Sequence, residues 1–198
     1  MINNALVFLK LQKLLYHLMI GLKRGTVKLK SYNSKWKQAY EKEKKLLLNA
    51  LGDLIVDIQH VGSTSIPGVQ AKPIIDIAVT VESFKKASGY IETLERIGYK
   101  YKTDDDKPNR LFFTKGPENK RTHYLHIGTA RGNYIRDMIL FRDYLNRHKG
   151  AVKEYNNLKT ALAEKFGKER EQYTEGKSGF VEKIVKKAKK RNKRISGR

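Results

Sequence analysis

The sequence predicts an α+β fold, in which helices flank a mixed β-sheet and a helical part follows. Short apolar segments bounded by Gly, Pro or Asp recur across residues 54–128 and are typical of strands. Segments with apolar residues three and four positions apart, typical of helices, lie between them and fill residues 133–191. The length of 198 residues suits one domain with an appendage, large enough to bury a core without disulfides.

In the first half, alternating apolar residues and turn signals predict a strand, a helix and two further strands. Asn33 or Ser34 can cap the helix, and Gly52 ends it. The predicted elements are a strand at 27–32, a helix at 36–51, a strand at 54–61, a turn-rich connection at 62–72 and a strand at 73–81.

In the second half, one more helix and three strands precede a run of helices. Ser83 caps the first helix and Gly98 ends it. The predicted elements are a helix at 83–97, strands at 99–102, 111–115 and 122–128, and helices at 133–148, 151–166 and 169–191.

Both ends of the chain differ from its middle. Residues 1–25 predict an amphipathic helix that packs on the domain or docks on another surface, because charged residues interrupt every apolar run long enough to span a membrane. Residues 26–186 form the predicted domain, and residues 187–198 a basic tail. The net charge is +22, which favours a polyanion such as nucleic acid as a partner, although Lys-rich exposed helices are also common. The lack of Cys fits a reducing, cytoplasmic location.

The segment HVGSTSIPGVQAKPIIDIAV, residues 60–79, carries the chemistry. Gly62 lets the backbone approach a ligand closely, and Ser63 and Thr64 offer hydroxyls to a phosphate. Asp76 follows on an apolar strand, where carboxylates two residues apart would hold divalent cations on one face. Residue 78 is Ala, so the second carboxylate of a two-metal site is absent.

This segment resembles the GrpB family, a group of small bacterial proteins with a nucleotidyltransferase-like fold. The resemblance extends over about residues 26–186, through KLKSYNSKWKQAYEKEK, RTHYLHI, FRDYLNRH, EYNNLKTALAEKF and REQYTEGKSGFVEKIV. It implies the fold, a nucleotidyltransferase-like mixed sheet with flanking helices, and nucleotide or phosphate chemistry. It does not name an activity, because a fold does not carry one by itself. In this family, as here, the second carboxylate is absent.

Asp76, His126 and His60 are the candidate catalytic residues, as metal ligands or proton shuttles. Strand alternation places His126 on one face with Thr122 and Tyr124, and His123 on the other. Asp76 and His126 together suit one divalent cation, Mg²⁺ or Mn²⁺ before Zn²⁺, or no metal. The structural alternatives are a buried ion pair for Asp76, core packing for His126 and a backbone hydrogen bond for His60.

Lys72, Arg110 and Arg121 precede three of the predicted strands and would neutralise a triphosphate if they gathered near Ser63. Surface charge is the alternative for each residue taken alone. Three functions therefore remain open. The chain can be a nucleotide- or phosphate-binding protein with a divergent transferase site, a non-catalytic RNA- or polyanion-binding module, or an accessory protein that docks through residues 1–25.

Overall fold

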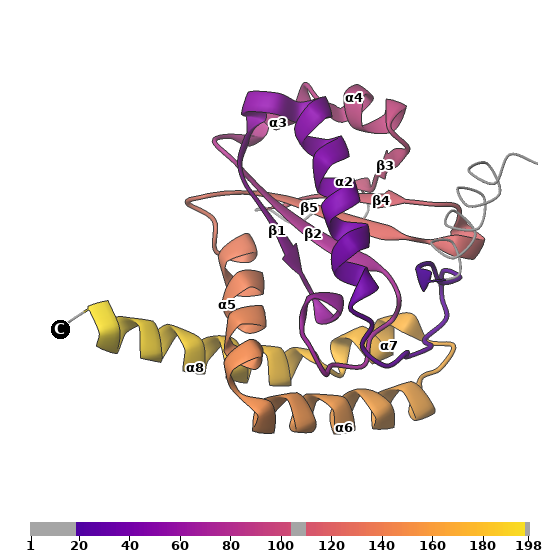
Figure 1. Cartoon of the computed structure of the whole chain (residues 1–198), viewed down its shortest axis with the longest axis vertical. Helices are drawn as coiled ribbons and strands as arrows, with labels where there is room; N and C mark the ends of the chain where they lie inside the picture. Colours follow the sequence, from indigo (N-terminus) through magenta and orange to yellow (C-terminus); the bar gives the residue numbers. More distant parts are fainter. Residues whose placement is uncertain (1–18, 104–109, 197–198) are drawn as a thin grey trace, which may run out of the picture.

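The computed structural model describes residues 19–103 and 110–196. One mixed sheet with the strand order β1-β2-β5-β4-β3 lies at its centre (Figure 1). The strands are β1 (Ile55–Val61), β2 (Ile75–Val81), β3 (Tyr99–Tyr101), β4 (Leu111–Lys115) and β5 (His123–Thr129). The described α-helices are α2 (Lys35–Leu51), α3 (Phe84–Ser88), α4 (Ile91–Arg96), α5 (Asn133–Arg147), α6 (Lys149–Lys165), α7 (Arg170–Glu175) and α8 (Ser178–Ser196).

The pairing of β2 with β5 sets the position of the site. These two strands are parallel, whereas β1 with β2, β5 with β4, and β4 with β3 are antiparallel. The register pairs Asp76 with Tyr124 and Ala78 with His126. Because side chains alternate along a strand, Asp76 and His126 point to the same face of the sheet.

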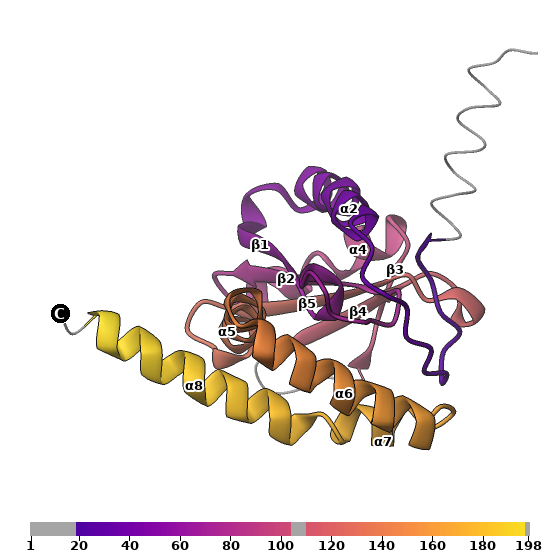
Figure 2. The same cartoon turned by 60° about the horizontal axis from the view of Figure 1, so that its bottom comes forward.

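One face of the sheet is covered by α2 and carries the main apolar core (Figure 2). Trp36 and Leu47 of α2 are 1% and 0% exposed and pack against Ile77 of β2 and Leu125 of β5. The apolar positions of α2 recur at helical spacing, so burial of one stripe against the strands stabilises both elements. The sequence prediction of an α+β sheet with flanking helices is confirmed.

The helices α5, α6 and α8 lie on the opposite side (Figure 2). Ile135 of α5 packs on Val61 and Ala78 of the sheet. A second apolar cluster joins α5, α6 and α8 around Ile66 and Val69 of the β1–β2 connection. The C-terminal helices therefore hold the Gly-Ser turn from one side, while the sheet holds it from the other.

Three predicted elements differ in the structure. Residues 27–32 form no strand, since their β-pairing is limited to an isolated bridge between Lys30 and Ala71, beside one backbone hydrogen bond from Val27 to the Gly167 carbonyl. The helix expected at 83–97 is two short helices, α3 and α4, separated at Gly89 and Tyr90. The helix expected at 169–191 is likewise divided into α7 and α8, and Gly176 between them lies against Leu162 of α6, where a Cβ would clash.

The structure describes only part of the two predicted terminal segments, residues 1–25 and 187–198. Residues 1–18 of the predicted amphipathic extension lie outside the described residues. Ile20, just after them, is buried at 1% exposure, and Leu22 pairs with Arg121, so this part packs on the domain. At the other end, α8 continues as a helix through residue 196. Among the described helices, none is long and apolar enough to cross a membrane.

Candidate functional site

A tight turn after β1 brings the backbone against the carboxylate of β2. Gly62 has a φ of 69°, a conformation that favours glycine. A Cβ at this position would overlap the Asp76 carboxylate, so residue 62 must be Gly for two independent reasons. Ser63 and Thr64 follow in a single 3₁₀ turn, Ser63–Ser65. The turn therefore presents Ser63 beside Asp76.

Asp76 and His126 lie side by side on the face opposite α2. His126 Nε2 is 3.5 Å from Asp76 Oδ1, which is long for a hydrogen bond, and the side chains are 8% and 25% exposed. On its other side, His126 Nδ1 lies 3.4 Å from the Tyr134 hydroxyl. Arg110 Nη1 donates to that hydroxyl at 2.9 Å, and Phe112 stacks on the imidazole at 5.0 Å between ring centroids. A polar chain thus runs from Asp76 through His126 and Tyr134 to Arg110.

Three lysines, Lys72, Lys159 and Lys177, form a cluster on the other side of Asp76, which we call the lysine cluster. Lys159 is 1% exposed, and its Nζ donates to Ser63 Oγ at 3.0 Å and to the Gln70 carbonyl. Burial holds the pKa of Lys159 well below its usual value, and Lys177 and Lys72 lower it further.

The other two lysines share one aromatic ring. Lys72 Nζ and Lys177 Nζ lie 5.3 Å and 4.4 Å from the centroid of the Tyr173 ring. Burial, with Lys177 and Arg170 nearby, lowers the pKa of Lys72 to about 7. Burial also lowers the pKa of Lys177 to about 8, and the Asp76 carboxylate opposes that effect. Partly desolvated cations thus face one carboxylate.

The structure brings together only some of the residues that the sequence singled out. Gly62, Ser63, Lys72, Asp76 and His126 share this face of the molecule. Lys159 and Lys177 were missed, although a lysine on the apolar stripe of a predicted helix is a detectable signal. It would have identified Lys159, which follows Tyr155 by one helical turn on the buried side of α6.

Other predicted residues lie elsewhere. His60 stacks on Tyr40 of α2 at 4.8 Å between ring centroids, on the opposite face of the sheet from Asp76. Burial lowers the pKa of His60 to about 4, and its Nε2 lies 3.0 Å from Thr64 Oγ1. Thr64 is 2% exposed and faces the Ile74 carbonyl, so its hydroxyl is not presented to a ligand. His60 thus contacts the Thr64 hydroxyl and the Tyr40 ring, not the backbone carbonyl expected in its structural alternative, and Thr64 has a role inside the turn.

The two arginines do not gather at Ser63 as the sequence suggested. Arg110 belongs to the His126 chain described above. Arg121 Nη1 donates to Thr114 Oγ1 and to the Gly116 carbonyl, both at 2.8 Å. Of the three predicted phosphate-binding cations, only Lys72 joins the lysine cluster.

The donor set does not fit a pair of divalent cations. Among residues 19–103 and 110–196, no group of three or more His, Cys, Asp or Glu side chains is placed to hold a metal ion. Asp76 and His126 alone fit one cation shared with a ligand. Their 3.5 Å separation is close to the roughly 3.0–3.4 Å between two ligand atoms that are each about 2.1 Å from one metal.

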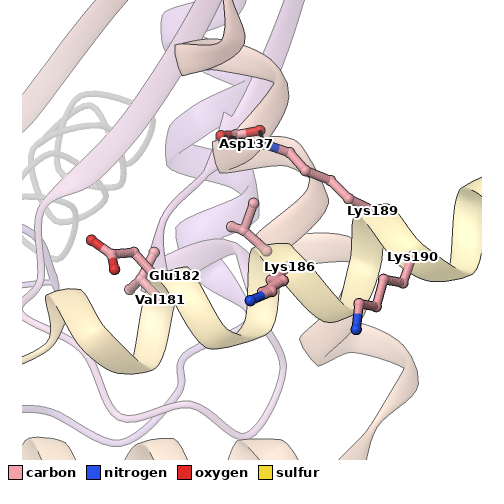
Figure 3. A pocket seen from close by; sticks show the side chains of 7 residues that line it. Asp137, Val181, Glu182, Lys186, Lys189 and Lys190 are labelled. Atoms are coloured by element: carbon pink, nitrogen blue, oxygen red, sulfur yellow. Dashed lines mark hydrogen bonds and ion pairs between the residues drawn. The ribbon is translucent and has the colours of Figure 1, made fainter.

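A separate groove of about 460 Å³ lies between α5 and α8 (Figure 3). Val181 and Val185 line its floor, and Lys189 Nζ lies 2.7 Å from Asp137 Oδ1 at its rim. Lys186 and Lys190 extend from α8 along the same groove, as Figure 3 shows. It shares no residue with the Asp76 face, and its Asp137 is already paired with a lysine.

Comparison with known proteins places this geometry in a family. A family model described as "GrpB protein" matches residues 26–187. The "Glutamate-rich protein GrpB" of Alkalihalophilus pseudofirmus is 40% identical over 171 residues, which cover 84% of this chain and 98% of that protein. The crystal structure of conserved protein GrpB from Enterococcus faecalis has a TM-score of 0.77 at 34% identity and covers 83% of this chain and 99% of that chain.

A more distant likeness shows the fold alone. A solved structure of the Cid1 poly(U) polymerase bound to MgATP aligns with a TM-score of 0.50 at 15% identity, over 68% of this chain and 44% of that chain. The nucleotidyltransferase-like fold expected from the sequence is confirmed by this similarity.

Proposed function

The chain belongs to the GrpB family, and from the geometry around Asp76 we propose that it binds a nucleoside triphosphate through the Gly62–Ser63 turn and the lysine cluster, in a divergent nucleotidyltransferase site. The observation that carries this proposal is the charge around one carboxylate. Three lysines face Asp76, and the pKa of each is lowered chiefly by burial, so the free site is only partly protonated and can take up protons when an anion binds.

An anionic ligand would favour the charged forms of these lysines. Burial disfavours the charged form of each lysine, and the lysines also repel one another. A triphosphate supplies several negative charges and oxygen acceptors for Nζ donors, and it would restore the ordinary protonation of Lys72 and Lys177. Ser63 Oγ, held by Lys159 at 3.0 Å, stands where a phosphate oxygen would meet both the turn and the cluster.

Asp76 would reach the same phosphates through a divalent cation, Mg²⁺ or Mn²⁺, with His126 as its second protein ligand or as a proton acceptor. A bound cation supplies positive charge that offsets repulsion between the carboxylate and the phosphates. Tyr134 orients His126 from the far side of the imidazole. The site thus has one cation position where a two-metal transferase has two.

Calorimetric titration of the full chain with ATP, GTP and CTP, with and without Mg²⁺ or Mn²⁺, tests this function. We expect metal-dependent binding that is lost in Asp76→Ala and weakened at least tenfold in Lys159→Gln. Lys85→Gln, which removes one charge from the exposed surface of α3, is the matched control and should bind normally. Asp76→Ala also removes a negative charge beside the lysine cluster. Tighter metal-independent binding in that variant would therefore contradict a cation-bridged ligand.

A second candidate function rests on α8. This helix extends beyond the family match, which ends at residue 187, and its C-terminal half projects from the body of the molecule (Figure 1). Its exposed cations include Lys183, Lys186, Lys187, Lys190 and Arg191. Such a surface suits RNA or another polyanion, bound through phosphates without base recognition.

Binding of a single-stranded RNA of mixed sequence, followed by fluorescence anisotropy, separates the two candidates. RNA binding through α8 would weaken steeply with salt, survive Asp76→Ala and fall in a chain truncated after residue 186. An unchanged affinity in the truncated chain would remove α8 from this role.

A further inference from the structure

A small pocket lies over β4 and β5, on the same face of the sheet as Asp76. We call it the arginine pocket, and its volume is about 20 Å³. Its lining comprises Arg24, Lys102, Phe112, Thr114, Arg121, Tyr124 and Arg170. The four cations come from segments that are far apart in sequence, and no acidic side chain of residues 19–103 or 110–196 lines the pocket. The fold thus gathers positive charge at a second point on the sheet face that carries Asp76.

Neighbouring contacts hold two of these guanidinium groups in place. Arg121 Nη1 is fixed by the Thr114 hydroxyl and the Gly116 carbonyl, both at 2.8 Å. Arg170 Cζ lies 5.4 Å from the centroid of the Tyr124 ring. The Nε of Arg170 is buried and has no hydrogen-bond partner among the described residues. A buried donor without an acceptor is costly, so a ligand oxygen at this point would be stabilising.

The charge in the pocket is balanced only at its edge. Arg24 pairs with Glu118 at 2.8 Å, and the side chains of this pair are 56% and 69% exposed. Burial lowers the pKa of Arg121, while the nearby Glu118 carboxylate opposes that effect. Counted over the described residues, the cations that line the pocket therefore outnumber the carboxylates near it.

We infer that the arginine pocket is a second anion site, which receives a phosphate-ester or similar tetrahedral oxyanion. Arginine forks match the oxygens of such groups in a bidentate manner. A volume of about 20 Å³ is little more than the roughly 10–15 Å³ that one water needs, so the pocket receives one or two oxygens of such a group and excludes a base or sugar. The ligand is thus a molecule anchored by its phosphate, with the remainder outside.

The position of the pocket gives this ligand a place beside the nucleotide. Asp76 lies on β2, between the turn that follows β1 and the arginine pocket over β5 and β4. Tyr124, which lines the pocket, is the direct strand neighbour of Asp76. If the proposed function holds, on which this step rests, the lysine cluster takes the nucleotide and the arginine pocket takes the phosphate of a second substrate.

Titration of ¹⁵N-labelled full chain with inorganic phosphate, monitored by amide chemical shifts, tests the second site. We expect saturable shifts at Thr114, Arg121 and Tyr124 that persist when saturating ATP and Mg²⁺ occupy the lysine cluster. Arg170→Gln should weaken phosphate binding at these amides at least tenfold, and Lys102→Gln about fivefold. Lys102→Gln should leave the affinity for ATP within about twofold, as should the surface control Lys85→Gln.

Phosphate shifts confined to Ser63 and Gln70, and abolished by ATP, would overturn the second site while leaving nucleotide binding intact. Pocket shifts with an unchanged midpoint in both Arg170→Gln and Lys102→Gln would also overturn it. A chain that binds no nucleotide but still shows saturable shifts in the pocket would instead defeat the proposed function and keep the anion site.

Discussion

Strand β5 places one histidine on each face of the sheet, and each meets a carboxylate in different surroundings. On the α2 side, His123 Nε2 lies 3.8 Å from Glu43 Oε2, and Lys115 Nζ binds the same carboxylate at 2.7 Å. On the other side, His126 lies 3.5 Å from Asp76. The residue types are nearly the same, but only the first pair has a single matched cation and is enclosed in the core.

The difference shows that charge balance, more than residue identity, separates a structural pair from a candidate site. The carboxylate of Glu43 is 7% exposed and closely paired, so it is satisfied without any ligand. Asp76 is 25% exposed and faces three lysines whose pKa values are lowered, in each case chiefly by burial. A folded chain keeps such an imbalance at a cost in stability, which ligand binding can offset.

Removing the carboxylate from the balanced side should have the largest effect on the fold. Glu43→Ala leaves Lys115 and His123 without their buried partner, and we expect a loss of about 3 kcal/mol in the free energy of unfolding. Urea denaturation measures it, and Glu41→Ala on the exposed side of the same helix should change stability by less than about 0.5 kcal/mol. A small loss in Glu43→Ala, similar to that of the control, would show that this pair is not structural.

On the Asp76 face, by contrast, the positive charge of a partly buried lysine should lower the free energy of unfolding. The pKa of Lys72 is about 7 in the folded protein and about 10.5 when unfolded, so between these pH values the unfolded chain binds more protons. The free energy of unfolding should therefore rise from pH 7 to pH 10, with a contribution from Lys72 on the order of 2 kcal/mol. Denaturation of Lys72→Met across this range should show a flatter profile and higher stability at pH 7. A profile identical to that of the natural chain would contradict a desolvated lysine.

The sequence predicts the strand pair and its faces better than the site that forms around it. Alternation along residues 122–128 correctly separated His123 from His126, because the period of a strand is fixed by its backbone. The sequence also assigned Gly62 and Asp76 to one site, and in the structure the backbone of Gly62 lies against the Asp76 carboxylate. Local geometry was sufficient for these residues.

Lys159 and Lys177 needed information that local patterns do not contain. Lys159 meets Ser63 across 96 residues of sequence, through the docking of α6 beside the turn. Lys177 lies at the break before α8, where Gly176 packs against Leu162, which is again a long-range contact. Periodicity identifies a buried helix face but not the element that covers it. The same limit explains residues 27–32, where the alternation is present but no neighbouring strand pairs with the segment beyond one isolated bridge.

The smallest expected effect is a change of ATP affinity with pH. It tests directly whether the Asp76 face differs from the Glu43 face. The pKa values of Lys72 and Lys177 are about 7 and about 8, so both lysines lose protons between pH 7 and pH 9 in the free protein. A nucleoside triphosphate saturated with Mg²⁺ is fully deprotonated on its phosphates over this range, so a loss of affinity points to groups of the protein. We expect the affinity for ATP with Mg²⁺ to fall about tenfold from pH 7 to pH 9, equivalent to about 1.4 kcal/mol.

Calorimetry in two buffers of different ionisation enthalpy would add a second measurement, because binding should take up protons near pH 8. Lys177→Gln should bind more weakly at pH 7 and show a flatter pH profile, whereas Lys85→Gln should retain the natural profile. His123 offers no such dependence, since burial lowers its pKa to about 4 and its face of the sheet is closed. A constant affinity for ATP from pH 7 to pH 9, with no proton uptake, would mean that ligand binding does not change the protonation of the lysine cluster. The cluster would then be structural, like the Glu43 pair. The distinction between the two faces would then be lost.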